Sequence, residues 1–317
     1  MINGLAAVGM CAWDHFLVSE RYPGPGDYTI VTAEFEQAGG TTSNTCTALG
    51  LLGLSPFLAS SVGADPYGDA IVASLADAGC DVSAIERRQD APTDRSVIVI
   101  SGKGDTLDRT IFWIQGARPV AGQRFPVEEI LEHRWVLLDV DDPRLRQFWL
   151  DLPAHWSPRT RLIGTMIYLV DMPVEYGWRQ ALEHDVIFGN RREFLALTGA
   201  ADLDSAIEYT RKQLAGNACE AAFVSLGPEG SVAIRTSGVT RIPAFSLDVV
   251  DTTGAGDAFT AGCIWGLLDG LSDDQILRRG NAIGGLACTA LGARAGLPNR
   301  EAADKALSTL QPRPADA

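Results

Sequence analysis

The sequence lacks the features that would place it in several large classes of protein. Its 317 residues carry 26 Lys and Arg against 40 Asp and Glu, and the net charge of −14 argues against a nucleic-acid partner. No apolar run reaches the ~18 residues of a membrane span, so no membrane partner is expected. The N-terminus has no basic region followed by an apolar stretch and a cleavage site, so no signal peptide is predicted. We therefore expect a cytoplasmic protein.

Cysteine is present, but not in a spacing that would bind a metal. The six cysteines are Cys11, Cys46, Cys80, Cys219, Cys263 and Cys288. No two of them are close enough for a zinc pattern, and most lie in apolar runs. Buried free thiols in a reducing compartment are the expectation. The chain also has no internal repeat, and at 46% hydrophobic residues it can bury a sizeable core.

One glycine-rich stretch, residues 251–259 (Asp-Thr-Thr-Gly-Ala-Gly-Asp-Ala-Phe), carries the clearest chemical signal in the chain. The preceding residues 245–250 alternate and end on two valines, which predicts a strand, and the following residues have a helical period. In a tight turn between them, the backbone N–H groups of Gly254, Ala255 and Gly256 can point at one anion. The stretch is neither a Walker A loop nor a dinucleotide fingerprint, because no Gly-Lys-Ser/Thr and no third glycine follow.

Asp257 falls in the first turn of the predicted helix, beside the predicted anion site. A carboxylate next to an anion is unfavourable unless it does chemistry, and the chemistry that fits is general-base catalysis. In this interpretation Asp257 takes a proton from an acceptor hydroxyl while the amides hold the phosphoryl group. The alternative is that Asp257 only caps the helix and the glycines only make the turn.

Several motifs occur in the order that one known family has. Residues 251–259 resemble the C-terminal signature of the ribokinase (PfkB) family of carbohydrate kinases, and residues 39–44 resemble its N-terminal signature. The resemblance runs from Asp14 to about Pro298. It implies an α/β fold with a doubly wound, mostly parallel central sheet flanked by helices and a small β-sheet lid, as a single domain over residues 1–317. The strand–helix alternation of the sequence agrees with this.

The resemblance implies that Asp14, Gly40 and Asn44 hold hydroxyl groups of a sugar. Asp14 follows the apolar residues 4–10, which predict a buried first strand, and ligands of open α/β sheets bind at the carboxyl edge. The alternatives are that Asp14 is a solvated turn residue and that Asn44 is a local cap at the start of a helix.

The resemblance also implies nucleotide and magnesium sites in the second half of the chain. Asn190 and Glu193 would help to hold Mg²⁺, largely through water, which suits an ion that keeps most of its waters. Their alternative is a capping box at the start of a helix. Ser225, Gly227 and Gly230 match a glycine-rich segment that binds the nucleotide.

Two further features of the family lie near the C-terminus. Asn281, in a small-residue stretch predicted as a helix over residues 281–292, stands where the family often has a residue near the nucleotide base. The loop 292–296 resembles one that closes a K⁺ site together with backbone carbonyls near Asp251 and Thr253. ATP and Mg²⁺ are therefore the expected cofactors, and K⁺ is a further candidate.

Two strand pairs stand apart from the alternation of strands and helices, over about residues 15–37 and 93–116. In sugar kinases of this family such a sheet forms a lid over the sugar site, and in several it is a dimer contact, so a homodimer through the lid is expected. Phe112 and Trp113 suit either use, and the alternative is an ordinary edge of the main sheet. Residues 139–142, which include three aspartates, are interpreted as a solvated strand end rather than a cation site.

The function predicted from these residues is ATP-dependent phosphorylation of a primary hydroxyl of a small sugar such as ribose, fructose or a related keto-sugar. Three alternatives stay open. A nucleoside kinase of the same fold would need an aromatic slot, for which Trp13, Phe16, Phe112 and Trp113 are the candidates. A kinase of phosphorylated sugars would need Arg95 and Arg109 to face the pocket. A sugar-sensing protein without catalysis would be at odds with the intact motif at residues 254–257.

Overall fold

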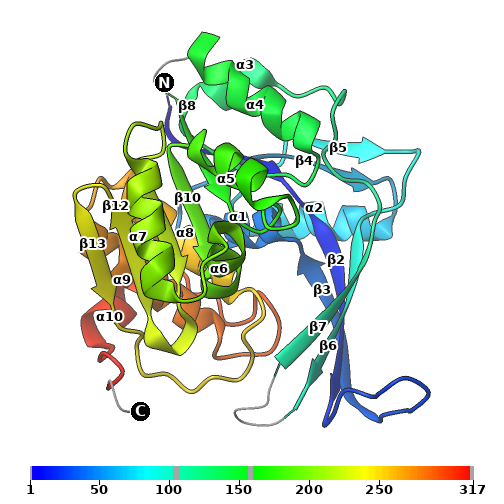
Figure 1. Ribbon diagram of the computed structural model, residues 1–317. Coiled ribbons are helices and arrows are strands. Elements are labelled where there is room, and N and C mark those ends of the chain that lie inside the picture. The colour runs from blue at the N-terminus through cyan, green and yellow to red at the C-terminus, as the bar shows by residue number, and fades with distance from the viewer. Residues whose placement is uncertain (1, 103–107, 156–159, 315–317) are drawn as a thin grey trace.

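A large, mostly parallel sheet forms the centre of the molecule (Figure 1). The computed structural model describes residues 2–102, 108–155 and 160–314, with side chains left out at 2–3 and 153–155. The nine strands of this sheet lie in the order β13-β12-β11-β10-β9-β8-β1-β4-β5. In that order they span Gly238–Ile242, Ser231–Arg235, Ala221–Ser225, Val186–Asn190, Arg161–Thr165, His133–Asp139, Ile2–Gly9, Phe57–Gly63 and Ile85–Arg88. Only β12 and β13 run antiparallel to their neighbours, which confirms the predicted fold class.

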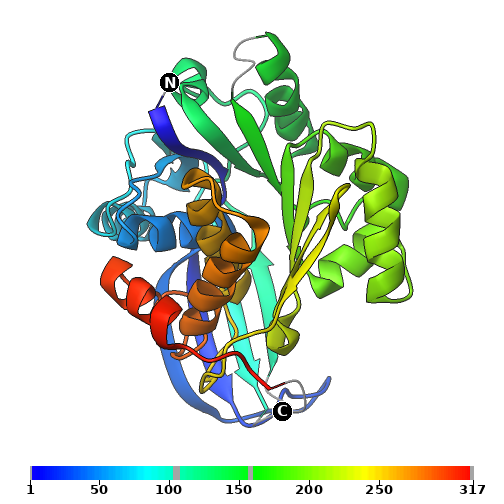
Figure 2. The same ribbon diagram turned by 90° about the vertical axis from the view of Figure 1, so that its left-hand side faces the viewer.

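Helices cover both faces of this sheet (Figure 2). One face carries α1 (Thr41–Leu51), α2 (Pro66–Asp77), α8 (Ala255–Leu268), α9 (Asp273–Ala287) and α10 (Arg300–Thr309). The other carries α3 (Val127–Leu131), α4 (Pro143–His155), α5 (Val174–Leu182), α6 (Arg191–Thr198) and α7 (Leu203–Leu214). Among the described residues, no helix combines the length and the apolar character that crossing a membrane requires.

The central strands are buried on both faces because their residues are apolar without a break. In β8, Trp135 and Leu137 pack into the core under α1 and α8, whereas Val136 and Leu138 pack into the core under α4. Successive side chains of a strand point to opposite faces, so a strand covered twice needs an unbroken apolar run. The sheet thereby provides a rigid base for the ends of its strands.

The order of strands reverses between β1 and β8. From β1 the chain moves outward to β4 and β5, and it then returns to place β8, β9 and β10 on the other side of β1. Ligands of open α/β sheets bind in the crevice that opens at the carboxyl ends of such neighbouring strands. Gly9 ends β1 and Asp139 ends β8 at this position.

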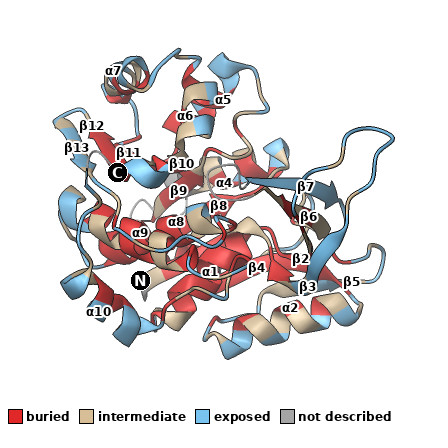
Figure 3. Ribbon diagram, turned by 90° about the horizontal axis from the view of Figure 1, so that it is seen from below, coloured by how far each residue is buried: buried red, intermediate tan, exposed pale blue. Residues whose placement is uncertain are grey.

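A second, four-stranded sheet stands beside the first in the order β3-β2-β6-β7 (Figure 3). Its strands are β2 (Ala12–Ser19), β3 (Val31–Gly39), β6 (Arg95–Ser101) and β7 (Asp108–Ile114). Phe16, Ile98 and Ile100 form a small core of their own, and Phe16 stacks on Phe35 with ring centroids 4.6 Å apart. The separate small sheet is confirmed, so these strands are not an ordinary edge of the main sheet.

Two predicted elements differ from the structure. Residues 245–250 form no strand, because the sheet ends at β13 and Phe245 makes only an isolated bridge to Pro312. The alternation there arises because Leu247 packs against α9 at Gly285. The helix expected over residues 281–292 is α9, which begins earlier, at Asp273, and ends at Ala287.

Candidate functional site

A cleft of about 660 Å³ opens at the carboxyl ends of the central strands, between them and the small sheet. Most of the residues singled out from the sequence line it. Those residues are Asp14, Gly40, Asn44, Asn190, Glu193, Ser225, Gly227, Thr253, Gly254, Ala255, Gly256 and Asp257. Segments more than two hundred residues apart in the sequence therefore meet at one opening.

The N-terminus of α8 faces the cleft. Gly254 caps the helix with φ 76°, in the left-handed region that favours glycine. A Cβ at Gly254 would lie 2.7 Å from the Cβ of Ala293, so a side chain is excluded there by contact as well. The first N–H groups of a helix have no intrahelical partner and, with the positive end of the helix dipole, form a site for an anion. At the start of α8, the N–H of Ala255 also donates to the carbonyl oxygen of Thr252 at 3.2 Å.

Asp257 lies in the first turn of α8, half-buried at the same opening. Its Oδ2 accepts a hydrogen bond of 2.9 Å from Nδ2 of Asn44. Burial raises the pKa of Asp257 to about 8, and the nearby carboxylates Asp139 and Glu193 raise it further, while Asn44 and Arg109 oppose them. A carboxyl group that titrates near neutrality is suited to accept a proton from a hydroxyl.

Asn44 is placed by the turn that begins α1. Gly40, the N-cap residue, has φ 92°, and a Cβ there would lie 2.8 Å from the carbonyl oxygen of Met10. The chain therefore passes from β3 into α1 in close contact with the end of β1. Asn44, 6% exposed, then points from the first turn of α1 towards Asp257. The local helix-cap alternative does not apply, because no side chain caps α1 by a hydrogen bond.

Asp14 lies shortly after β1, within β2 of the small sheet, so the alternative of a solvated turn residue is wrong. It is only 4% exposed, and burial raises its pKa to about 6, although Arg294 and Ser96 act in the opposite direction. Asp94, which no sequence pattern singled out, lines the same part of the cleft. Its two oxygens accept from Trp113 Nε1 and from the backbone N–H of Gly116, both at 2.6 Å.

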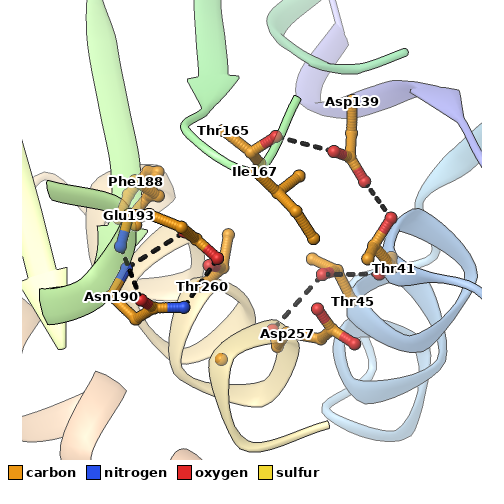
Figure 4. A pocket seen from close by; sticks show the side chains of 12 residues that line it. Thr41, Thr45, Asp139, Thr165, Ile167, Phe188, Asn190, Glu193, Asp257 and Thr260 are labelled. Carbon is orange, nitrogen blue, oxygen red and sulfur yellow. Dashed lines mark hydrogen bonds between the residues drawn. The ribbon is translucent and has the colours of Figure 1, made fainter. Parts of the chain in front are cut away.

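A small recess of about 60 Å³ lies deeper, between α1, α6 and α8 (Figure 4). Asp139, Glu193 and Asp257 line it. Asp139 is 2% exposed and accepts hydrogen bonds from the hydroxyls of Thr41, Thr42 and Thr165. The interpretation of residues 139–142 as a solvated strand end is therefore wrong for Asp139, which ends β8 at the reversal of strand order.

Asn190 and Glu193 form the capping box at the start of α6. Asn190 Oδ1 accepts from the Glu193 N–H at 3.0 Å, and Glu193 Oε2 accepts from the backbone N–H of Asn190 at 3.2 Å. Asn190 Nδ2 also donates to Glu193 Oε1 at 2.6 Å. Burial raises the pKa of Glu193. Together with Asp139 and Asp257 these groups give the recess an excess of oxygen donors and negative charge, which fits a hydrated Mg²⁺. Among the described residues, no group of three or more His, Cys, Asp or Glu side chains could hold a metal ion by itself.

Three of the selected residues do not line the cleft. Asn281 Nδ2 donates to the carbonyl oxygens of Ile242 and Pro243, so its side chain fastens α9 to the end of β13. Gly230 shapes the turn before β12 with φ 100°. Asp251 Oδ2 accepts from the N–H of Gly292 at 2.8 Å, which joins the two loops of the predicted K⁺ site.

Two arginines complete the site and were not assigned to it from the sequence. Arg109 reaches from β7 across the cleft, where its Nη1 donates to Thr252 Oγ1 at 3.1 Å. Arg294 lies behind the cleft, where its Nε donates to Asn44 Oδ1 at 2.8 Å. From the sequence alone, Arg109 is expected only as a ligand for a phosphorylated sugar. The loop that contains Arg294 is related there only to a K⁺ site, and the Arg294 side chain has no assigned role.

Known proteins resemble this chain over most of its length. The sequence model of the pfkB family carbohydrate kinases matches residues 3–117 and 173–300. A ribokinase of Bacillus subtilis is 25% identical over 313 residues, covering 97% of this chain and 100% of the relative. A 2-dehydro-3-deoxygluconokinase of the same organism is 30% identical over 294 residues, covering 83% of this chain and 84% of the relative.

Solved structures share the fold. The ribokinase of Arabidopsis thaliana, complexed with ribose and ATP, superposes with a TM-score of 0.79 at 24% identity and covers 97% of this chain and 99% of its own. The ribokinase of Giardia lamblia superposes with a TM-score of 0.82 at 20% identity, over 96% of this chain and 98% of its own.

Proposed function

The chain belongs to the pfkB family of carbohydrate kinases, and we propose that it transfers a phosphoryl group from ATP to a primary hydroxyl of a small, uncharged sugar such as ribose or fructose. As a member of this family it is a phosphotransferase with a sugar hydroxyl as acceptor. One observation carries the proposal most directly. Asp257 and the amides of Gly254, Ala255 and Gly256 lie in the same cleft as Asp14 and Asn44.

In the proposed reaction Asp257 accepts the proton of the attacking hydroxyl. The amides at the start of α8 bind the charge that develops on the transferring phosphoryl group, and they are already aligned before the reaction begins. Arg109, which reaches the neighbouring Thr252, would add a cation at the same place. Phosphoryl transfer is catalysed mainly by positioning the reactants and by fixed charges that stabilise the transition state. Asp257, the amides and Arg109 are groups of the type that this catalysis requires.

Sugar hydroxyls would be held by Asp14, Asn44 and the backbone at Gly40. Asn44 uses one of its two N–H donors for Asp257 and one oxygen lone pair for Arg294, which leaves one donor and one acceptor for a substrate. Asp14 would accept from a second hydroxyl. Its low exposure strengthens such a hydrogen bond, because water cannot compete for the carboxylate.

The nucleotide would lie towards Asn190, Ser225 and Gly227, at the ends of β10 and β11. Asn190 and Glu193 would hold Mg²⁺ through water, and the ion would offset the charge of the phosphates. K⁺ bound by backbone carbonyls near Asp251 and Thr253 remains part of the proposal. Asn281 and Gly230 would act indirectly, because neither lines the cleft.

The geometry favours a sugar over the alternatives. Of the four aromatic candidates for a nucleoside slot, only Trp113 lines the cleft, and Phe16 is buried inside the small sheet. Of the two arginines that a kinase of phosphorylated sugars would need, Arg109 lines the cleft, whereas Arg95 lies over the ring of Tyr67, 5.8 Å from its centroid. Asp14 and Asp94 would also repel a second phosphate or a carboxylate on the sugar.

A homodimer through the small sheet is a further part of the proposal. Phe112 and Ile114 are exposed on β7 and alternate with Ile111 and Trp113, which line the cleft. An exposed apolar strand is a usual site of association. Light scattering should show a dimer for the wild type and a monomer for Phe112→Asp. A monomeric wild type would contradict this part of the proposal.

The decisive experiment replaces the base. Asp257→Asn keeps the shape of the side chain but cannot accept the proton, so we expect turnover to fall by about 10³-fold or more. The dissociation constant for ATP, measured by calorimetry, should change less than about twofold because the amides remain. Wild-type turnover in this variant would remove Asp257 from the mechanism.

A substrate panel tests the acceptor. Ribose, fructose, 2-keto-3-deoxygluconate, fructose 6-phosphate, adenosine and inosine would be compared by kcat/KM with ATP and Mg²⁺. We expect ribose or fructose to lead the series. If adenosine or inosine has the highest kcat/KM, the protein is a nucleoside kinase instead. If none of the six compounds supports ATP consumption, the proposed class of acceptor is wrong.

A further inference from the structure

A buried hydrogen-bonded chain runs from Arg294 through Asn44 to Asp257. Arg294 Nε donates to Asn44 Oδ1 at 2.8 Å, and Asn44 Nδ2 donates to Asp257 Oδ2 at 2.9 Å. We propose that Arg294 is a positioning residue that fixes the orientation of the Asn44 carboxamide, so that an N–H donor always faces the base. The inference rests on the proposed function, because it requires Asp257 to be the base.

The chemistry of the two partners leaves the carboxamide one orientation. A guanidinium has only donors, so the oxygen of Asn44 must face Arg294. The amide nitrogen must then face Asp257, which as a carboxylate has only acceptors. Without Arg294 the carboxamide could turn by 180° about its last torsion and present its oxygen to Asp257, since the two orientations have nearly the same shape.

The orientation decides which protonation state of Asp257 is favoured. An N–H facing the carboxyl group stabilises the ionised form, which is the form that can accept a proton. An oxygen facing it would stabilise the protonated form, which is inactive as a base. The hydrogen bond from Asn44 opposes the burial that raises the pKa of Asp257, and Arg294 would keep that hydrogen bond in place.

Arg294 is itself held firmly, which a positioning residue requires. Its Nη2 donates to Ser43 Oγ at 2.5 Å and to the carbonyl oxygen of Gly39 at 3.4 Å, and its Nη1 donates to Ser74 Oγ at 3.2 Å. Among the described residues no carboxylate forms an ion pair with it. The guanidinium is thus committed to neutral oxygens on β3, α1 and α2, and its position does not depend on a surface ion pair.

The test measures kcat/KM against pH for the wild type and four variants: Arg294→Met, Arg294→Lys, Asn44→Ala and the double variant Arg294→Met/Asn44→Ala. In the wild type, kcat/KM should rise with pH along an acid limb and then reach a plateau. Arg294→Met should shift the acid limb to higher pH by about 0.5–1 unit and lower kcat/KM on the plateau by about 10- to 100-fold. Arg294→Lys still donates to Asn44 Oδ1, so its limb should stay in place although its plateau falls a few-fold, because an ammonium lacks the fork of donors.

The double variant tests whether Arg294 acts through Asn44. If it does, removing Arg294 should cost little once Asn44 is gone, so Arg294→Met/Asn44→Ala should resemble Asn44→Ala. If the fold losses of kcat/KM in the two single variants multiply in the double variant, the inference is overturned. It is also overturned if Arg294→Met has the same acid limb and the same plateau of kcat/KM as the wild type. Should Arg294→Met not fold, the comparison of Arg294→Lys with Asn44→Ala decides, and a limb moved equally in both would overturn it.

Arg294→Met also removes a positive charge that lowers the pKa of Asp14 and interacts with Asp257, whereas Arg294→Lys keeps that charge, so the double variant separates this direct effect from the effect through Asn44. The other charged or titratable groups around Asp257 stay the same in every variant. They are Asp139 on β8, Glu193 on α6, Arg109 on β7 and Tyr168 after β9. Arg146 supplies the control for loss of a buried arginine. It is 3% exposed, donates to Gln180 Oε1 at 2.9 Å and to the carbonyl oxygen of Val140 at 2.5 Å, and lines neither the cleft nor the recess. Arg146→Met should lower the melting temperature without moving the acid limb.

The inference and the proposed function fail in different ways. Wild-type turnover in Asp257→Asn would overturn the function and the inference with it. An inactive Asp257→Asn together with a wild-type pH profile in Arg294→Met would overturn only the inference.

Discussion

The two sheets of the molecule form opposite walls of one cleft, and they are built differently. The central strands of the nine-stranded sheet are buried between helices on both faces, whereas β7 of the four-stranded sheet is exposed along its whole length (Figure 3). The proposed phosphoryl site lies at the end of α8, a helix that is buried from Ala258 to Leu268. The proposed sugar contacts come partly from β2 of the exposed sheet.

This difference suggests a division of labour. Groups that must be aligned before reaction, such as the amides beside Asp257, gain from a rigid and dry base. Groups that select a substrate can lie on a sheet that has a small core of its own and is free to adjust. Changes on the α8 wall should therefore abolish turnover, and changes on the wall of the small sheet should mainly alter KM.

The largest effect is expected from Gly254→Val. A β-branched residue is strained at φ 76°, and its Cβ would meet Ala293, so the start of α8 must shift. We expect kcat to fall by about 10³-fold, since the loss of one such donor costs 10²- to 10³-fold and several would move here.

Gly270→Val is the matched control for Gly254→Val. Gly270 follows the other end of α8 with φ 68°, and a Cβ there would meet no atom within 4 Å. It should lose stability through the same backbone strain yet keep its turnover. Equal loss of turnover in both variants would show that the strain alone, and not the anion site, is responsible.

The dependence of kcat/KM on pH compares the two walls directly. The pKa of Asp257 is raised to about 8 and that of Asp14 to about 6, and both must be ionised to accept protons or hydrogen bonds. Activity should therefore rise with pH, by about tenfold per unit between pH 6 and 8 and more steeply below pH 6. A profile that is flat from pH 6 to 8 would contradict the role of Asp257.

The role of a residue could be predicted where it depends on its neighbours in the sequence. It could not be predicted where it depends on contacts with residues far away in the chain. The motif around Asp257 and the turn before Asn44 are contiguous, so their backbone requirements are visible in the glycines. Arg294 lies 250 residues from Asn44 in the chain, and no local pattern connects them. Asp94 and Asp139 look like ordinary polar ends of strands until the fold buries them.

The helices and strands show the same limit. The apolar run of residues 4–10 predicts the buried strand β1, and the structure confirms it. Residues 245–250 alternate like a strand, but in the described part of the chain they form only one isolated bridge, between Phe245 and Pro312, and a strand needs a neighbour for its hydrogen bonds. Whether a strand has a pairing partner depends on the whole sheet, and the sequence of six residues does not show it.

Asp14→Asn tests the small-sheet wall with a smaller effect. The amide is the same size but carries no charge, so a hydrogen bond to a sugar hydroxyl weakens by about 1.5 kcal/mol. We expect KM for the sugar to rise on the order of tenfold, with kcat within about threefold of the wild type. The steeper part of the pH profile below pH 6 should also disappear. A fall in kcat with unchanged KM would place Asp14 in the chemical step instead.

The smallest effect is expected from Trp113→Phe. The indole N–H donates to Asp94 at 2.6 Å, and this bond sets the angle at which the ring faces the cleft. Phenylalanine keeps an aromatic face but leaves an oxygen of Asp94 unpaired, so KM should rise about three- to tenfold while kcat stays nearly constant. Trp13→Phe is the matched control, because Trp13 lies in the same sheet and donates to Glu36 at 3.0 Å without lining the cleft. Equal effects of the two variants on KM would mean that the small sheet responds as a whole and that Trp113 has no separate contact with the sugar.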